Sequence, residues 1–201
     1  MGKEQEVIGN DALGIDESKK RDHKKGKKEK SFFREAVEIL LIAFVLAFVV
    51  RTFVAENFWV PSRSMVPTIQ VNDRVLVTKF SYKIADPERG DIVVFEPPAT
   101  AHAGEEEKFY VKRLIALPGE TVEFKDNVLY IDGEVVDEPY LREDVINEDF
   151  GPYVVPENSY FFCGDNRTGS YDSRAWGSVE RDSLVGKGQF IWWPFDRMGG
   201  L

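Results

Sequence analysis

Hydrophobic and polar positions follow three different patterns along this chain. Residues 1–31 contain no aromatic residue and no hydrophobic periodicity, which predicts a segment without stable structure. An apolar segment follows at 32–55, with an uncharged run from 39 to 50. From residue 56 onward, short apolar runs are separated by Gly, Pro and Asp, a pattern typical of short β-strands joined by turns.

The short apolar runs predict one antiparallel β domain behind an N-terminal helix, so the expected fold class is mainly β. We expect strands at residues 74–80, 91–95, 108–115, 128–131, 134–136, 159–163 and 189–193. Asp132-Gly133 separates two of these runs and predicts a type I′ hairpin, because Gly accepts a positive φ. Residues 141–152 fit no strand and are interpreted as an insertion or lid.

The apolar segment at 32–55 is predicted to be a transmembrane helix. Its uncharged run is shorter than the ~20 residues that cross ~30 Å of hydrocarbon. The whole segment is long enough if Glu35, Glu38 and Arg51 lie near the interfaces. A buried helix of a soluble domain is the competing interpretation. Eight Lys or Arg residues between 19 and 30 precede the segment, and such residues stay on the cytoplasmic side.

These charges predict a single-pass anchor, with the tail at 1–31 in the cytoplasm and residues 56–201 outside. A cleaved signal peptide fits less well, because a long tail comes first. Phe53 also stands where a cut after Ala55 would require a small residue.

The composition excludes several function classes. The chain has a net charge of −9, and its acidic bulk argues against nucleic acid as a partner. One cysteine, Cys163, excludes a disulfide framework and a multi-cysteine zinc site. The two histidines, His23 and His102, are unsuited to a metal site or a Ser-His-Asp triad. We therefore expect no metal and no cofactor.

Two segments contain groups with the chemistry of a nucleophile and a base. Ser62 and Ser64 lie in a proline-bracketed turn, which is either an ordinary loop or a catalytic one. Lys112 lies in an apolar strand, where it and Arg113 point to opposite faces. Lys112 is either a charge that protects an edge strand or a desolvated amine that can accept the proton of a serine hydroxyl.

A third segment, at 164–174, is polar, punctuated by Gly and directly follows an apolar strand. Taken alone it is a turn, because neither EF-hand spacing nor a nucleotide-binding loop is present.

Together the three segments resemble the motifs of bacterial type I signal peptidases, which are membrane-bound serine proteases with a Ser-Lys dyad. The matching sequences are PSRSMVPT at 61–68, YVKRLIALPGE at 110–120, and GDNR at 164–167 with SYDSRAWG at 170–177. The resemblance extends from the apolar segment through Trp193. It implies an antiparallel β catalytic domain of the signal peptidase type, which removes signal peptides from translocated preproteins after A-x-A-like sites.

The resemblance also implies a role for each matching residue. Ser64 would be the nucleophile and Lys112 the general base. Ser62 would donate to the oxyanion together with the Ser64 N–H, and Ser170 would orient the Lys112 amine. Asp172 would pair with Arg174 and Arg113 and support the site.

Seven apolar residues match the walls of the pockets that accept small side chains at −1 and −3 of the signal peptide: Phe58, Val60, Pro61, Met65, Ile69, Tyr110 and Val111. The resemblance implies a bacterial cytoplasmic (inner) membrane as the location, and preproteins and the lipid bilayer as partners. Arg63, between the two serines, and Tyr171 depart from residues common in the family.

Two other functions remain as alternatives. One is a self-cleaving Ser-Lys repressor of the DNA-damage response, which would need a DNA-binding domain and an internal cleavage site. The other is a membrane-tethered β binding module, in which Ser64 and Lys112 have no chemical role.

Overall fold

The computed structural model describes residues 17–49, 55–101, 108–142 and 145–201. The chain forms two units, 1–48 and 49–201, which are described separately. Expectations about residues 1–16, Arg51, Phe53 and His102 lie outside the described residues.

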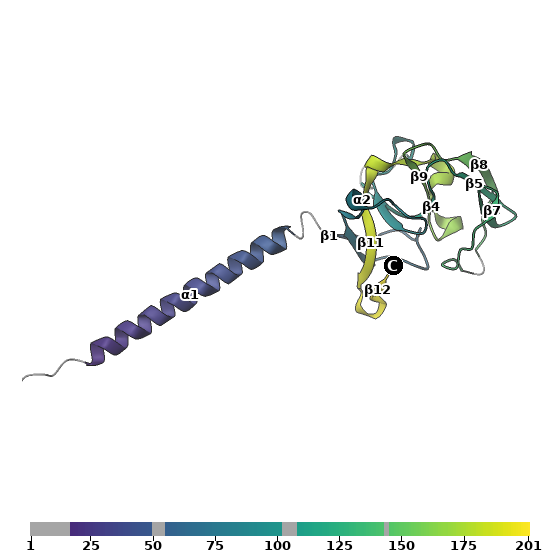
Figure 1. Cartoon of the computed structure of the whole chain (residues 1–201). Coiled ribbons are helices and arrows are strands. Elements are labelled where there is room, and N and C mark those ends of the chain that lie inside the picture. The colour runs from purple at the N-terminus through teal and green to yellow at the C-terminus, as the bar shows by residue number, and fades with distance from the viewer. Residues whose placement is uncertain (1–16, 50–54, 102–107, 143–144) are drawn as a thin grey trace, which may run out of the picture. The chain divides into compact units, whose positions relative to one another are not determined.

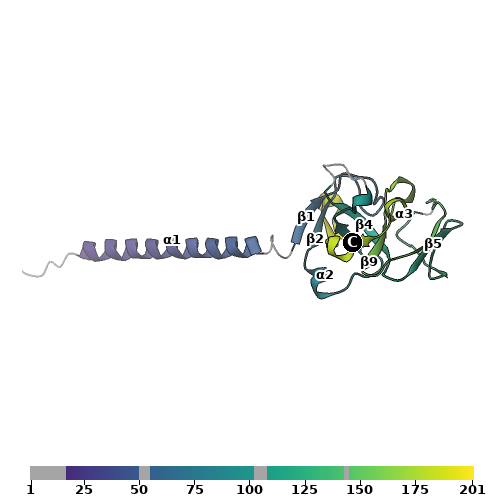
Figure 2. The ribbon, with the colours of Figure 1, turned by 90° about the horizontal axis from the view of Figure 1, so that it is seen from above.

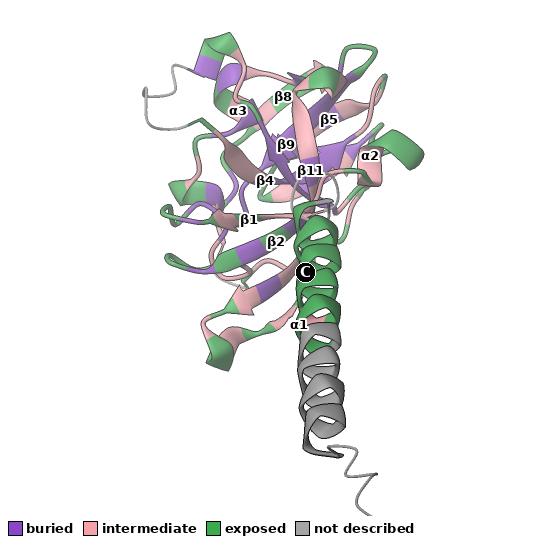
Figure 3. Ribbon diagram, turned by 90° about the vertical axis from the view of Figure 1, so that its left-hand side faces the viewer, coloured by how far each residue is buried: buried purple, intermediate pink, exposed green. Residues whose placement is uncertain are grey.

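The first unit is dominated by one helix, α1 (Glu17–Val49), drawn as a single coil in Figure 1. It begins well before residue 32, where the sequence pattern predicted the start of structure. The added turns are rich in Lys, which has good helix propensity. Large apolar side chains from Phe32 to Phe48 are exposed, as the green part of α1 in Figure 3 shows. Within the described residues, no helix combines the length and the apolar character needed to span a bilayer.

The second unit consists of short strands and short helices. Its strands are β1 (Ala55–Trp59), β2 (Arg74–Thr78), β3 (Ile92–Phe95), β4 (Tyr110–Ala116), β5 (Thr121–Lys125), β6 (Val128–Ile131), β7 (Glu134–Val135), β8 (Phe150–Val154), β9 (Ser159–Cys163), β10 (Val179–Glu180), β11 (Leu184–Trp193) and β12 (Gly199–Gly200). Its helices are α2 (Ser81–Ile84), α3 (Ser173–Trp176) and the 3₁₀ turns η2 (Ala99–Ala101), η3 (Arg167–Gly169), η4 (Arg181–Ser183) and η5 (Phe195–Arg197).

The strands form two antiparallel sheets. The larger sheet has the order β1-β2-β11-β3-β4-β9-β10, with β12 paired to β11, and the smaller has the order β7-β6-β5-β8. Figures 1 and 2 both show β5 at one end of the β domain and β1 at the other, with β4 and β9 between them. The predicted antiparallel, mainly β fold is confirmed.

Most of the predicted strands are present with small shifts. The hairpin between β6 and β7 has Asp132 and Gly133 both at positive φ, as a type I′ turn requires. The sequence pattern missed β1, because Ala55 was assigned to the apolar segment. It also missed β5 and β8. The lid interpretation is wrong for residues 150–152, which belong to β8 and pair with β5 inside the smaller sheet, and it stays a prediction for the rest of 141–152.

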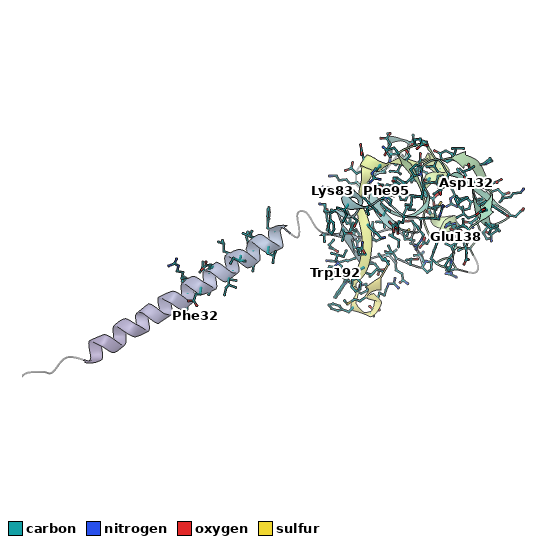
Figure 4. All side chains as sticks on the ribbon, viewed as in Figure 1. Phe32, Lys83, Phe95, Asp132, Glu138 and Trp192 are labelled. Atoms are coloured by element: carbon teal, nitrogen blue, oxygen red, sulfur yellow. The ribbon has the colours of Figure 1, made fainter. Side chains whose placement is uncertain are left out.

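Three hydrophobic clusters hold the β domain together. One lies between β4, β9 and the smaller sheet, and includes Phe124 and Phe161. A second packs Met65 and Ile69 against β2 and β11. The third surrounds Phe95, which is labelled in Figure 4 and stacks on Phe162 with the ring centroids 4.6 Å apart. The buried strands β4 and β9, largely purple in Figure 3, therefore form the rigid centre of the domain.

Candidate active site

The turn that contains the two serines is anchored by apolar residues that pack in the hydrophobic core. Met65 and Ile69 are fully buried, and the Ile69 N–H donates to the Met65 carbonyl at 2.9 Å. Above them, the Ser62 and Ser64 hydroxyls lie 3.1 Å apart, within hydrogen-bond distance. Ser64 is only 6% exposed, so its hydroxyl is held in one place and is largely shielded from bulk water.

Lys112 lies on a strand at the centre of the larger sheet. Strand β4 is bonded to β3 on one side and to β9 on the other, so Lys112 does not protect a sheet edge. Its side chain is 5% exposed, and its Nζ lies 5.7 Å from the centre of the Tyr110 ring, on the same face of the strand. Burial of an amine favours its neutral form, which is the form that accepts a proton.

Gly164 joins the serine turn to the lysine strand. Arg113 pairs with Cys163 across β4 and β9, so Gly164 follows β9 at the level of Lys112. A Cβ at Gly164 would collide with the Ser64 carbonyl oxygen and with the Ser170 hydroxyl. The Ser64 carbonyl also accepts a hydrogen bond of 3.0 Å from the Asn166 N–H. Residues from three distant parts of the sequence thus meet at one position.

Ser170 is the second side chain packed against Gly164. Its hydroxyl is buried and, within the described residues, has no hydrogen-bond partner. The hydrogen bond to Lys112 that the resemblance implies is therefore not formed in this structure. A buried hydroxyl without a hydrogen-bond partner is costly.

A cleft of about 410 Å³ opens beside the serine turn. We call it the serine cleft, and the described residues that line it are Phe58, Trp59, Val60, Pro61, Ser62, Arg63, Ser64, Lys108, Phe109, Tyr110, Val111, Lys112, Gly169 and Tyr171. It includes five of the seven predicted wall residues. Met65 and Ile69 do not line it, because both side chains are buried in the core beneath the turn.

The salt bridge predicted between Arg113 and Asp172 is absent, because Arg113 pairs with Asp165 instead. Two Arg113 nitrogens donate to the two Asp165 oxygens, at 2.8 and 2.7 Å. The Thr68 hydroxyl donates to the same carboxylate. Asp165 therefore ties the end of the serine turn to the lysine strand. Sequence reasoning missed it, although it stands in the GDNR motif one residue from Gly164.

Asp172 does pair with Arg174, at 2.8 Å. Its carboxylate also accepts from the backbone N–H of Arg174, at the start of α3, and from the Gly164 N–H at 3.1 Å. We call residues 164–174 the polar loop. Asp172 thus connects the start of α3 to Gly164 within this loop, and it supports Gly164 without Arg113.

A second buried ion pair connects the polar loop to the smaller sheet. Two Arg167 nitrogens donate to the Glu138 carboxylate, at 3.0 and 2.5 Å, and Arg167 also donates to the Asn147 side chain at 3.1 Å. Both side chains of the pair are almost fully buried. Sequence reasoning missed this contact, because Glu138 and Asn147 lie in a region without strand or motif character.

Cys163 is fully buried next to Gly164, and burial raises the pKa of its thiol well above the usual range. The protonated thiol is a poor nucleophile, so the candidate nucleophile of this site is Ser64. Among the residues that the structure describes, no group of His, Cys, Asp or Glu side chains is arranged to hold a metal ion.

Comparisons with known proteins identify one peptidase family. The profile of the family described as "Signal peptidase, peptidase S26" matches residues 33–193. A probable signal peptidase I-2 of Synechocystis sp. is 42% identical over 167 residues, which cover 83% of this chain and 76% of that protein. Signal peptidase I of Bacillus licheniformis is 40% identical over 187 residues, with coverages of 88% and 97%.

A crystal structure of a signal peptidase I from Enterococcus faecalis V583 is 36% identical to this chain. The match covers 51% of this chain and 97% of that one, with a TM-score of 0.43. This TM-score is too low to support an argument about the fold.

Proposed function

Because this chain belongs to the signal peptidase family, peptidase S26, and is a serine endopeptidase of the signal peptidase I type, we propose that Ser64 is its nucleophile and Lys112 its general base. The observation that supports this dyad most directly is the burial of both side chains on the walls of one cleft. A self-cleaving repressor and a binding module are no longer supported as alternatives, because the peptidase family profile matches residues 33–193, which include most of the β domain.

In the proposed mechanism, the neutral Lys112 amine takes the Ser64 hydroxyl proton as Oγ attacks the scissile carbonyl carbon. The carbonyl electron pair moves onto oxygen, and the Ser62 hydroxyl and the Ser64 N–H stabilise this oxyanion. The intermediate then collapses: the C–N bond breaks, the Lys112 ammonium protonates the leaving amine, and the acyl-enzyme remains. Lys112 next takes a proton from water, whose oxygen attacks the ester carbon. The bond between that carbon and Ser64 Oγ breaks, and Lys112 returns the proton to Oγ. The distance of 3.1 Å between the two serine hydroxyls supports the role of Ser62.

Ser170 is the positioning residue for Lys112 in this mechanism. Its buried hydroxyl has no partner among the described residues, and catalytic hydrogen bonds are often long or absent before substrate binds. Asp172 with Arg174, and Arg113 with Asp165, hold the segments that bring Ser170 and Lys112 to the cleft.

The substrates are preproteins, and the proposed cleavage sites are A-x-A-like. Apolar side chains at Phe58, Val60, Tyr110 and Val111, together with Pro61, line the cleft beside Ser64. An apolar wall favours apolar side chains of the substrate over charged ones. The resemblance to signal peptidases assigns the pockets for positions −1 and −3 to this wall.

Membrane anchoring is part of the proposal, with residues 32–55 as the anchor, 1–31 in the cytoplasm and 56–201 outside. The support is the exposed apolar surface of α1, which includes Leu40, Leu41 and Phe44 at 69%, 62% and 70% exposure. An exposed apolar surface of this extent needs an apolar partner. The basic residues before it favour a cytoplasmic N-terminus.

The dyad is tested by cleavage of a detergent-solubilised preprotein with an A-x-A site. Ser64→Ala and Lys112→Ala should each lower the rate by about 10³-fold or more, and the double variant should be hardly worse, because the two groups act as a unit. Ser183→Ala and Lys125→Ala, whose residues do not line the cleft, are the matched controls. Cleavage after the −1 Ala by either dyad variant at the wild-type rate would refute the assignment.

Anchoring is tested separately, by expressing the whole chain and the variant that lacks residues 1–55 in bacteria. The whole chain should stay in the membrane pellet after alkaline carbonate extraction, and the shortened chain should be released. Protease added to the outside of spheroplasts should digest the β domain and spare the tail. A tail that is digested while the β domain is protected would reverse the proposed orientation.

A further inference from the structure

The serine cleft has an unusual charge for this chain. Three of its described lining residues are charged, namely Arg63, Lys108 and Lys112, and all three are basic. No described lining residue is acidic, although the whole chain has a net charge of −9. Lys112 is used by the proposed mechanism, so Arg63 and Lys108 have no role yet.

Arg63 is the cation nearest to the nucleophile in the sequence. It stands between Ser62 and Ser64, whose hydroxyls lie 3.1 Å apart. It is exposed at the rim of the cleft. Its backbone, in contrast, is fixed, because the Arg63 carbonyl accepts from the Asn166 side chain at 3.1 Å and from the Val66 N–H at 3.2 Å. A long cationic side chain is thus attached to a rigid point next to Ser64.

The serine cleft combines apolar lining residues with two exposed basic ones, Arg63 and Lys108. Under the proposed function, the signal-peptide side lies on the apolar wall made by Phe58, Val60 and Tyr110. The charged rim at Arg63 is then left for the residues that follow the scissile bond. A cation at that place attracts a carboxylate side chain and repels a basic one.

We propose that Arg63 is a specificity-determining residue that favours preproteins with an acidic side chain at position +1, +2 or +3 of the mature protein. This inference rests on the proposed function, since it assumes that Ser64 attacks the scissile bond. The guanidinium would contact the carboxylate at the surface of the enzyme, where a single ion pair has a modest effect. It would not take part in bond breaking.

The test uses the whole chain in detergent and peptides with an A-x-A site that differ only by Asp or Asn at +1, +2 or +3. At low salt, the wild type should have a kcat/KM about two- to fivefold higher for Asp than for Asn at one or more of these positions. The preference should shrink at about 0.5 M salt, because screening shortens the range of exposed charges. Arg63→Gln should bring the Asp/Asn ratio to about 1.

Lys125→Gln is the matched control, because it removes one exposed positive charge outside the cleft, and it should keep the wild-type ratio. A wild-type ratio of 1, or a preference that survives in Arg63→Gln, would overturn the proposal. So would a preference lost in Lys108→Gln and kept in Arg63→Gln. In each of these cases the peptides are still cut and the proposed function stands. If the wild type cuts none of the peptides, both proposals fail.

Discussion

Removing one partner of the buried ion pair between Arg113 and Asp165 should destabilise the protein more than removing one partner of an exposed pair of the same geometry. Its shortest N–O distance is 2.7 Å, and the side chains are 9% and 0% exposed. Asp165→Asn keeps the shape of the side chain but leaves the buried guanidinium without its counter-charge. Removing one partner of a buried pair costs about 3–5 kcal/mol. For a domain of this size, such a loss lowers Tm by about 6–20 °C.

The pair of Arg181 and Asp86 provides the control. Its N–O distance is also 2.7 Å, but the Asp86 side chain is 85% exposed. Asp86→Asn should therefore change the free energy of unfolding by about 1 kcal/mol or less. Both losses can be measured by thermal unfolding followed by tryptophan fluorescence, which reports on the β domain because all four tryptophans lie there. Equal effects of the two substitutions would refute the argument from burial.

Three further predictions concern the site itself. Gly164→Ala should reduce cleavage by at least about tenfold, because its Cβ would collide with the backbone of Ser64, and an error of about 1 Å in catalytic geometry has a large effect on rate. Gly199→Ala, which meets open space, should cleave at the wild-type rate in the same assay. Cys163 should resist alkylation by iodoacetamide at pH 8 and react only after unfolding, since burial raises the pKa of its thiol and leaves little thiolate; mass spectrometry of the labelled chain gives the result, and rapid labelling of active enzyme would contradict it. The specificity constant kcat/KM should rise with pH until Lys112 is neutral. A kcat/KM that does not change with pH would argue against an amine base.

Much of the fold was readable from the sequence, because most of its strands are local apolar runs bounded by turn residues. The Asp132-Gly133 pair was enough to predict the hairpin between β6 and β7, and both residues have a positive φ. The pairing of β11 between β2 and β3 was beyond the same reasoning, since it joins segments more than 80 residues apart in the sequence. Strand β8 contains Gly and Pro, which are uncommon in strands, so the sequence pattern did not predict it.

The candidate catalytic residues were likewise predicted from motifs, but the residues that contact and support them were not. Asp172 was expected to reach Arg113, yet it is occupied by Arg174 only two positions away. Two residues so close in the sequence can pair through local geometry alone, whichever way the rest of the loop runs. The carboxylate left for Arg113 is Asp165, whose position depends on how the loop after β9 turns over the lysine strand. A single sequence contains no rule for that choice.

The polar loop that begins at Gly164 explains why the serine and the lysine can both be buried and still be held near each other. Its Asn166 N–H bonds to the Ser64 carbonyl, and its Asp165 carboxylate bonds to Arg113, the neighbour of Lys112. Arg167 fixes the far side of the loop to Glu138 in a buried pair. Since every one of these bonds is made by a backbone or a charged side chain inside the domain, the loop has little freedom to move. We therefore expect changes in this loop to lower activity through the spacing of Ser64 and Lys112, even where the residue changed never meets the substrate.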